Sequence, residues 1–258
     1  MSAIYARSEG ALDAVAQHLR ESRRVLFVTG AGVSADSGLP TYRGVGGLYD
    51  NGATESGLPI ETLLSRGTFR RDPALVWQYF ADREKRWRLA RPNACHRFIA
   101  RLEHRVEKVL VLTQNIDGLH GRAGSSRVIE IHGNLNDLIC TGCGTKRTVA
   151  TYRGLELPPA CKRCRAIERP DVVLFGEQLP EDKLKHFLDE LFSGFDMVIS
   201  IGTSGTFPYI RAPLIRAKVY DWPSVDINPT SNKMTPYARY HVPLGAAEAC
   251  ELLQQRLA

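Results

Sequence analysis

The chain has 258 residues, of which 43% are hydrophobic and 24% charged, which is typical of a globular protein and excludes a disordered or fibrous one. Its apolar runs are too short to cross a bilayer and no signal-like segment opens it, so we expect a cytoplasmic protein without membrane contact. The net charge of +6 has no recognisable nucleic-acid module beside it, so we assign it to a solvated surface or an anionic cofactor and expect no nucleic-acid partner.

Apolar strands alternate with helices along the chain. The periodicity predicts helices at 8–21, from Asp72-Pro73 onward, from Pro92 to about 105, at 181–192 and at 246–257. It predicts strands at 25–29, 109–112, 127–131, 172–175, 197–201 and 224–227. This alternation favours an α/β, Rossmann-like fold, a parallel sheet with helices on both faces, whereas residues 134–170 look like an inserted module.

A glycine-rich run follows the first predicted strand. It reads Gly30-Ala31-Gly32-Val33-Ser34-Ala35-Asp36-Ser37-Gly38-Leu39-Pro40-Thr41-Tyr42-Arg43. Glycine lets the backbone approach a ligand closely, and the N-terminus of the following helix presents free N–H groups to an anion. The run therefore predicts a phosphate-binding loop in a nucleotide enzyme. The glycine-rich segment from Gly44 to Gly57 is expected to be a mobile loop.

Polar clusters also follow the later strands. They are Gln114-Asn115-Ile116-Asp117, His132-Gly133, Gly202-Thr203-Ser204 and Asn228. Because the carboxyl ends of parallel strands meet at one edge of a sheet, we expect these residues to share one ligand-binding crevice. The ordinary pKa of a histidine suits His132 to general-base catalysis, although a histidine near a strand is more often a structural hydrogen-bonding group. The structural interpretation is the one that we favour for His120.

Four of the six cysteines form two matched pairs, Cys140-x2-Cys143 and Cys161-x2-Cys164. Each pair offers two thiolates to one ion, so the quartet predicts a closed tetrahedral zinc site. Such a site has no open position for water or substrate and is therefore structural. Disulfides do not suit the reducing compartment that we expect, and the remaining Cys95 and Cys250 are expected to be buried free thiols.

The ordered set of motifs resembles the sirtuin family, and within it the bacterial-type NAD-dependent protein deacylases. The motifs are the glycine-rich run, Thr113 to His120, Ile131-His132-Gly133, the cysteine quartet, Val172 to Glu177 and Gly202-Thr203-Ser204. The resemblance covers roughly residues 20–250. It implies that the protein transfers an acyl group from the lysine of a protein or peptide to ADP-ribose, consuming NAD and yielding nicotinamide, O-acyl-ADP-ribose and free lysine. It implies nothing about oligomeric state.

The resemblance also implies roles for single residues. His132, Asn115 and Asp117 match catalytic residues, and His132 would take a proton from a ribose hydroxyl after nicotinamide has left. The residues at NAD-binding positions are Gly30, Ala31, Gly32, Ser34, Ala35, Asp36, Pro40, Thr41, Tyr42, Arg43, Gln114, Asn115, Asp117, Gly202, Thr203, Ser204, Asn228 and Ala246. The strand from Val173 to Glu177 matches one that pairs with the substrate backbone, and its implied contacts are Val173, Phe175, Gly176 and Glu177.

The acyl pocket departs from one branch of that family. Members that prefer acidic acyl groups, such as succinyl-lysine, carry Tyr-x-x-Arg there, and this chain has Phe80 and Arg83 at those two positions, with Tyr79 one residue early. Arg83 would bind a substrate carboxylate, or else pair with Asp82, Glu84 or solvent. We expect deacetylase activity and leave acidic acyl groups open. A second departure is the run from Gly205 to Tyr209, where many relatives have a valine and then proline-alanine.

The resemblance and the motif spacing together divide the chain. We expect an NAD-binding Rossmann-like domain made of residues 1–43, 92–135 and 172–258, a cofactor loop and helical insertion at 44–91, and a zinc-ribbon module at 136–171. Mono-ADP-ribosyl transfer or NAD hydrolysis would use the same Asn115, Asp117 and His132 and is the alternative function. A non-catalytic NAD-responsive or zinc-ribbon module is disfavoured by the intact His132 and Asn115. A dehydrogenase is excluded because no acidic residue follows a second strand as its fingerprint requires.

Overall fold

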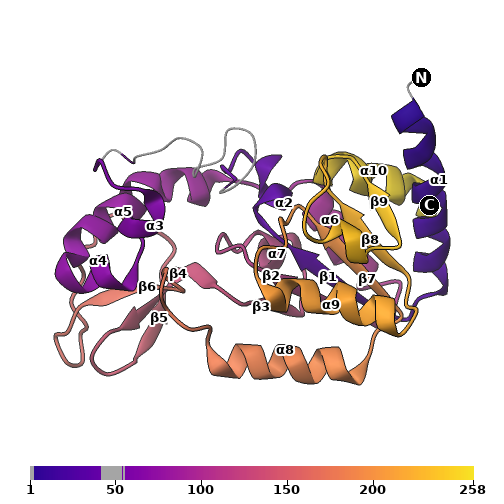
Figure 1. The fold of residues 1–258 in the computed structure, drawn as a ribbon. Helices are drawn as coiled ribbons and strands as arrows, with labels where there is room; N and C mark the ends of the chain where they lie inside the picture. The colour runs from indigo at the N-terminus through magenta and orange to yellow at the C-terminus, as the bar shows by residue number, and fades with distance from the viewer. Residues whose placement is uncertain (1–2, 42–53, 55) are drawn as a thin grey trace.

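The computed structural model describes residues 3–41, 54 and 56–258, which form two lobes (Figure 1). The larger lobe contains a six-stranded sheet in the order β3-β2-β1-β7-β8-β9, and every neighbouring pair is parallel. Its strands are β1 (Arg24–Thr29), β2 (Lys108–Thr113), β3 (Val128–Glu130), β7 (Met197–Ile201), β8 (Ser224–Ile227) and β9 (Tyr240–Val242). This sheet confirms the predicted Rossmann-like class.

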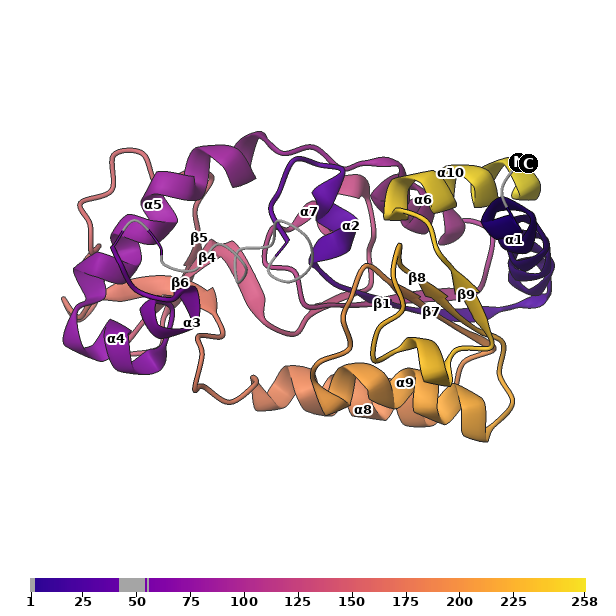
Figure 2. The same ribbon diagram turned by 45° about the horizontal axis from the view of Figure 1, so that its top comes forward.

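Helices cover both faces of the large sheet (Figure 2). One face packs against α1 (Ala3–Glu21), α6 (Ala94–Leu102) and α10 (Ala246–Leu257), and the other against α8 (Glu181–Ser193) and α9 (Pro208–Val219). Successive strand side chains point to opposite faces, so Phe27 packs in the first layer and Leu26 in the second, and neither is exposed. Burying a side chain of this size stabilises the fold by about 1.5–3 kcal/mol, and burial on both faces explains why these strands are uninterrupted apolar runs.

The strand register aligns the carboxyl ends of the strands. Thr29, at the end of β1, is paired with Thr113 at the end of β2 and with Ile201 at the end of β7. Ile201 is in turn paired with Ile227, the last residue of β8. The chain therefore leaves four neighbouring strands at the same edge, where the predicted polar clusters begin.

The smaller lobe packs three helices against a second sheet. The helices are α3 (Ile60–Leu63), α4 (Arg66–Arg71) and α5 (Pro73–Leu89), and the antiparallel sheet has the order β5-β4-β6, with β4 (Gly133–Cys140), β5 (Lys146–Thr148) and β6 (Glu168–Val172). The Asp72 side chain accepts a hydrogen bond from the Leu75 N–H at 3.0 Å and caps α5, as predicted. Trp77 on α5 is fully buried and its indole N–H donates to the Glu168 carbonyl at 2.8 Å, which joins the helix to the sheet.

The predicted strand at 172–175 is wrong in its bounds and in its sheet. The strand that is formed, β6, ends at Val172 and pairs with β4 rather than with the parallel sheet. Beyond it the chain pairs with the segment before α4, because the Phe175 N–H donates to the Leu64 carbonyl at 2.9 Å and the Arg66 N–H to the Phe175 carbonyl at 2.9 Å. The apolar run is thus buried by the core of the smaller lobe.

Helix α9 and strand β9 were not predicted. Pro213 lies inside α9 and interrupts its helical signal, and β9 has only three residues. Within the described residues, no helix is long and apolar enough to cross a membrane.

Two histidines pack together near the carboxyl end of β1. His120, on α7 (Leu119–Ala123), lies with its ring centroid 4.8 Å from that of His96, and its Nε2 is 3.0 Å from the Thr29 hydroxyl. Burial is the main cause that lowers the pKa of His96 from 6.5 to about 4, with a smaller contribution from Arg97, and that lowers the pKa of His120 to about 3, with a smaller contribution from His96. These contacts give His120 a structural role in the protein.

Replacing His120 by asparagine should flatten the acid side of the stability profile. A histidine that stays neutral in the folded state becomes protonated only on unfolding once the pH is below its unfolded pKa of about 6.5. The free energy of unfolding therefore falls as the pH falls toward the pKa of the folded state. The slope of the unfolding free energy between about pH 6 and 5 should therefore decrease by about 1.4 kcal/mol per pH unit in His120→Asn. Urea titrations measure it, with His104→Asn, an exposed site, as control. An unchanged slope in His120→Asn would contradict the assignment.

Candidate functional site

The glycine-rich segment after β1 crosses the segment after β7 at very short range. The Gly32 N–H donates to the Gly202 carbonyl at 2.9 Å, and a Cβ atom added to Gly32 would lie 2.7 Å from the Gly202 Cα. A Cβ atom on Gly30 would lie 2.8 Å from the Thr203 Cβ. Gly202 itself has φ +61, a conformation that favours glycine. Side chains are therefore excluded at these positions, because the backbone at the start of α2 (Ala31–Ala35) packs directly against the segment that follows β7.

Asn115 and Asp117 are held by the same segment. Asn115 is buried, and its side-chain amide donates to the Gly30 carbonyl at 3.0 Å and to the Ser34 hydroxyl at 3.1 Å. Ser34 donates in turn to Asp117 at 2.7 Å, and the other oxygen of that carboxylate accepts from the Leu119 N–H at 2.9 Å. Burial raises the pKa of Asp117, and these two hydrogen bonds oppose the rise. The network fixes an amide and a carboxyl group at the end of β2.

Three other predicted residues join the ends of β2, β7 and β8. The Gln114 side-chain amide donates to the Thr203 hydroxyl at 2.7 Å, and the Asn228 side-chain amide donates to the Thr203 carbonyl at 3.2 Å. Ser204 is exposed next to them. On the far side, Asp36 accepts a hydrogen bond from the Ala247 N–H at 3.0 Å, so the first turn of α10, which begins at Ala246, faces the end of α2.

His132 lies just beyond β3 and is largely buried. Its Nδ1 lies 3.0 Å from the Gln114 carbonyl oxygen, which can only accept, so Nδ1 carries the proton and Nε2 keeps the lone pair. The Tyr209 hydroxyl lies 2.6 Å from Nε2 and therefore donates to it. Burial lowers the pKa of His132 to about 4, so the imidazole is neutral near pH 7 and is available as a base.

A cavity lies between the two lobes. It is lined by Ala31, Ser34, Leu39 and Pro40 after β1, by Asn115, Ile116 and Asp117 after β2, by Tyr79, Arg83, Arg86 and Trp87 of α5, and by Leu135 of β4. Phe80, which was predicted to line the acyl pocket, is instead packed in the core of the smaller lobe against Trp87. The aromatic residue that lines the cavity beside Arg83 is Tyr79.

The guanidinium of Arg83 lies over the ring of Tyr79, 4.0 Å from its centroid. Of the two acidic neighbours that the sequence offered as partners, Asp82 accepts a hydrogen bond from Gln78 at 2.6 Å, and Glu84 pairs with Arg88 at 2.9 Å. Asp82 is exposed and Glu84 is buried, and each is bonded to a neighbour on α5; Arg83 and Tyr79 line the cavity.

The segment from Val173 to Glu177 is largely bonded to its own lobe. The Val173 N–H donates to the His132 carbonyl at 2.9 Å, which links this segment directly to the histidine. Glu177 accepts from the Arg169 guanidinium and from the Leu174 N–H at 2.9 Å; these bonds lower its pKa although burial opposes them. Within the described residues, the Gly176 N–H and the Val173 carbonyl have no hydrogen-bond partner, so these main-chain groups can pair with a peptide.

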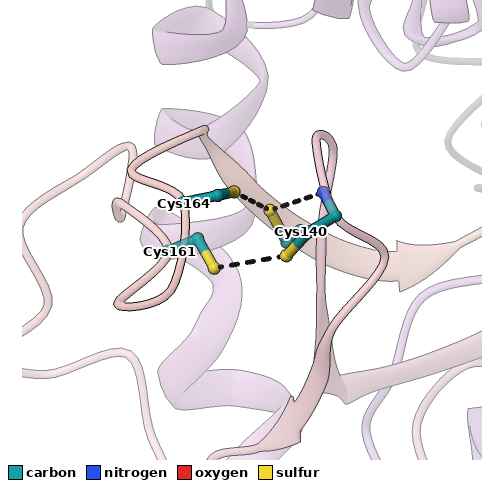
Figure 3. A group of neighbouring side chains, drawn as sticks. Cys140, Cys161 and Cys164 are labelled. Atoms are coloured by element: carbon teal, nitrogen blue, oxygen red, sulfur yellow. Dashed lines mark hydrogen bonds between the residues drawn. The ribbon is translucent and has the colours of Figure 1, made fainter.

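The four predicted zinc ligands come together at one end of the smaller lobe. Their sulfur atoms all lie within 4.8 Å of one another, with 3.4 Å between those of Cys140 and Cys164 and 3.8 Å between those of Cys143 and Cys161. Figure 3 shows the thiols of Cys140, Cys161 and Cys164 pointing toward one another. A tetrahedral zinc ion with Zn–S bonds of about 2.3 Å separates its sulfurs by about 3.8 Å, so the quartet fits zinc.

Some predicted site residues lie outside the described residues, and one residue at the site was not predicted. Tyr42 and Arg43, and most of the loop from Gly44 to Gly57, lie outside the described residues. No role was predicted for Tyr209, which contacts His132. The signal was the departure of the run from Gly205 to Tyr209, which places two aromatic rings between the end of β7 and the first turn of α9.

Comparisons with known proteins agree with this geometry. Residues 30–208 match the Sir2 family. The chain is 50% identical over 230 residues to "NAD-dependent protein deacylase 2" of Pseudomonas aeruginosa, an alignment that covers 86% of this chain and 88% of the relative. Among solved structures, a Sir2 homologue in complex with NAD superposes with a TM-score of 0.84 at 35% identity, covering 94% of this chain and 93% of that one. A Sir2 complex with a p53 peptide and NAD⁺ superposes with a TM-score of 0.80 at 29% identity, covering 94% and 96%.

Proposed function

The chain belongs to the Sir2 family and is an NAD-dependent protein deacylase, and from this premise we propose that His132 is its general base. The observation that supports this role is the contact of the imidazole Nδ1 with the Gln114 carbonyl. The Gln114 carbonyl holds the proton on Nδ1, so the Nε2 lone pair is directed away from the strand. A neutral, buried imidazole of this kind can take a proton from a ribose hydroxyl, which then becomes the nucleophile toward the acyl carbon.

We propose that the strand-end residues hold NAD, which supplies the ribose carbon from which nicotinamide leaves and the hydroxyl that receives the acyl group. Gly30, Gly32 and the first turn of α2 would bind the diphosphate, because a helix begins there and a helix N-terminus favours an anion. Asn115 and Asp117 would contact the nicotinamide ribose, since their network with Ser34 fixes both at the end of β2.

The remaining predicted NAD-binding residues are proposed to hold the rest of the cofactor. On the adenosine side they are Thr203, Ser204, Asn228 and Ala246. Along the glycine-rich segment they are Ala31, Ala35, Asp36, Pro40 and Thr41, continued by Tyr42 and Arg43. Gln114 would act through its bond to Thr203 and through its carbonyl, which orients His132.

The peptide backbone would pair with the segment that begins at Val173. That segment is bonded to the main chain of His132, so a peptide beside it lies close to the base. The available groups are the Val173 carbonyl and the Gly176 N–H, whereas Glu177 supports the segment through Arg169. Recognition through main-chain groups depends little on peptide side chains, so we expect a broad range of acyl-lysine proteins as substrates.

One structural zinc ion, bound by Cys140, Cys143, Cys161 and Cys164, belongs to the smaller lobe. Four thiolates leave no open position on zinc, so the ion takes no part in the reaction. We also propose a cytoplasmic location, because reduced thiols persist in that compartment.

The fate of the acyl group tests the proposed function. Incubation of the protein with NAD and an acetyl-lysine peptide should give deacetylated peptide and an equal amount of O-acetyl-ADP-ribose, measured by mass spectrometry. An NAD hydrolase would instead give ADP-ribose with the peptide unchanged. An ADP-ribosyltransferase would give a peptide that carries the ADP-ribose.

We further propose that Arg83 recognises acidic acyl groups, with Tyr79 beside it in place of the tyrosine expected at position 80. Both residues line the cavity between the lobes, and the ring of Tyr79 supports the guanidinium at 4.0 Å. A carboxylate at the end of a succinyl chain would find a charged donor there. Phe80 contributes by packing α5 against the smaller lobe and thereby fixing the direction of both side chains.

Replacing Arg83 by methionine should lower kcat/KM for a succinyl-lysine peptide by roughly 10- to 100-fold, because a hydrogen bond to a charged group contributes about 1.5–3 kcal/mol. The same variant should process an acetyl-lysine peptide within about twofold of the parent rate, since an acetyl group has no carboxylate. Lys85→Met, on the exposed face of α5, controls for the loss of a positive charge. Equal losses of kcat/KM for the two peptides in Arg83→Met would show that Arg83 does not bind the substrate carboxylate.

A further inference from the structure

We propose that Tyr209 is a positioning residue that acts through His132. In the free protein its phenol occupies the Nε2 lone pair that the ribose hydroxyl of NAD needs, so NAD binds in competition with this internal hydrogen bond. The proposal rests on the assignment of His132 as the base, and it adds a residue that controls access to that base.

The hydrogen-bond direction follows from the acceptor on the other side of the ring. The Gln114 carbonyl lies 3.0 Å from Nδ1 and accepts its proton, so Nε2 has a lone pair and no hydrogen. The Tyr209 hydroxyl, 2.6 Å away, is then the donor. One imidazole nitrogen has one lone pair, so Nε2 cannot accept from Tyr209 and from a ribose hydroxyl at the same time.

Neighbouring aromatic contacts hold the Tyr209 ring in place. Pro208 begins α9, and Phe207, directly before it, stacks on Tyr209 with ring centroids 5.6 Å apart and an interplanar angle of 15°. The same Phe207 ring meets His132 edge-on at 5.9 Å. Burial raises the pKa of Tyr209, so the phenol stays protonated and remains a donor.

The two rings differ in exposure. Phe207 is 41% exposed, whereas Tyr209, in the first turn of α9, is partly buried against the core of the larger lobe. A phenylalanine at position 209 keeps this packing, so the bond to Nε2 is the part of the displacement cost that the substitution removes. A hydrogen bond of ordinary net strength changes a binding constant by roughly two- to tenfold.

Tyr209→Phe removes the hydroxyl and keeps the stacked ring, and calorimetric titration with ADP-ribose measures the effect without any turnover. We expect Tyr209→Phe to bind ADP-ribose roughly two- to tenfold more tightly than the parent protein. In a His132→Ala background the same substitution should change the affinity by less than about twofold, because the competing bond is already absent. In steady-state assays the KM for NAD should fall by a similar factor while kcat stays within about twofold.

Unchanged or weaker ADP-ribose binding by Tyr209→Phe would overturn the proposal. An equal gain in the parent and in the His132→Ala background would also overturn it, because the effect would not pass through His132. These binding results do not depend on acyl transfer. A protein that binds ADP-ribose as expected and yet forms no O-acyl-ADP-ribose would disprove the proposed function and leave the competition in place.

Discussion

Replacing His132 by alanine should lower deacylation of an acetyl-lysine peptide by roughly 100- to 10,000-fold, the usual contribution of a general base. The Gln114 carbonyl orients a neutral imidazole just beyond β3, and in the proposed role alanine would leave the ribose hydroxyl without a proton acceptor. The fold and the zinc content should be unchanged, because His132 is bonded through its backbone carbonyl to Val173, and alanine keeps that bond. Peptide turnover with NAD, measured by chromatography, gives the rate.

A second measurement on His132→Ala separates the loss of the base from the loss of NAD binding. In the proposed mechanism the base acts only after nicotinamide has left, so peptide-dependent exchange of labelled nicotinamide into NAD should survive in this variant. His104→Ala, at an exposed site on the larger lobe, serves as the matched control. Turnover by His132→Ala close to that of the parent would refute the assignment, and loss of both turnover and exchange would place the role of His132 in binding.

Removing one zinc ligand should unfold the smaller lobe and abolish activity. Structural zinc contributes about 10–16 kcal/mol of apparent binding free energy in small zinc domains, which exceeds the stability of most domains. Cys161 is buried and holds the second pair of ligands against the first, so Cys161→Ser should lose stoichiometric zinc. Trp77 reports the consequence, since its indole N–H is bonded to the Glu168 carbonyl in the core of this lobe. Elemental analysis and tryptophan fluorescence measure the two effects.

The matched control for Cys161→Ser is Cys95→Ala, which alters a buried free cysteine away from the quartet. It should keep one zinc ion per chain and the parent activity. A Cys161→Ser protein that lost its zinc and kept full deacylase activity would contradict the structural role of the ion. The zinc module packs against α5, which lines the cavity. Full activity without zinc would mean that the cavity keeps its shape without an intact zinc module.

The elements that the sequence predicts best are those with a single physical cause. Strands β1, β2, β7 and β8 are buried on both faces, so they appear as uninterrupted apolar runs. The zinc site was predicted from cysteine spacing alone, because two Cys-x2-Cys pairs supply the four thiolates that one tetrahedral zinc ion needs.

The elements that were missed depend on contacts far apart in the chain. The run at 172–175 has the composition of a buried strand, and only its pairing with Leu64 and Arg66 shows that it belongs to the smaller lobe. Helix α9 contains Pro213, whose cost to a helix is offset by packing on the sheet.

The positions of the residues that follow each strand were predicted well, and those of residues whose side-chain direction matters were predicted less well. One residue along a helix turns the side chain by about 100°, so the gapless alignment that put Phe80 in the pocket could not show that Tyr79 faces the cavity. The contact of Tyr209 with His132 joins positions 77 residues apart and has no local pattern.

The dependence of nicotinamide release on acylated peptide tests the central claim most directly. If His132, Asn115 and Asp117 form a site in which NAD is cleaved by the acyl oxygen of the substrate, release from NAD should be negligible alone or with unmodified peptide. It should rise at least about 100-fold with acetyl-lysine peptide, in equal amount to the deacetylated product, since the acyl oxygen is then positioned as the nucleophile. Release at the same rate with and without acylated peptide would contradict the account and identify an NAD hydrolase.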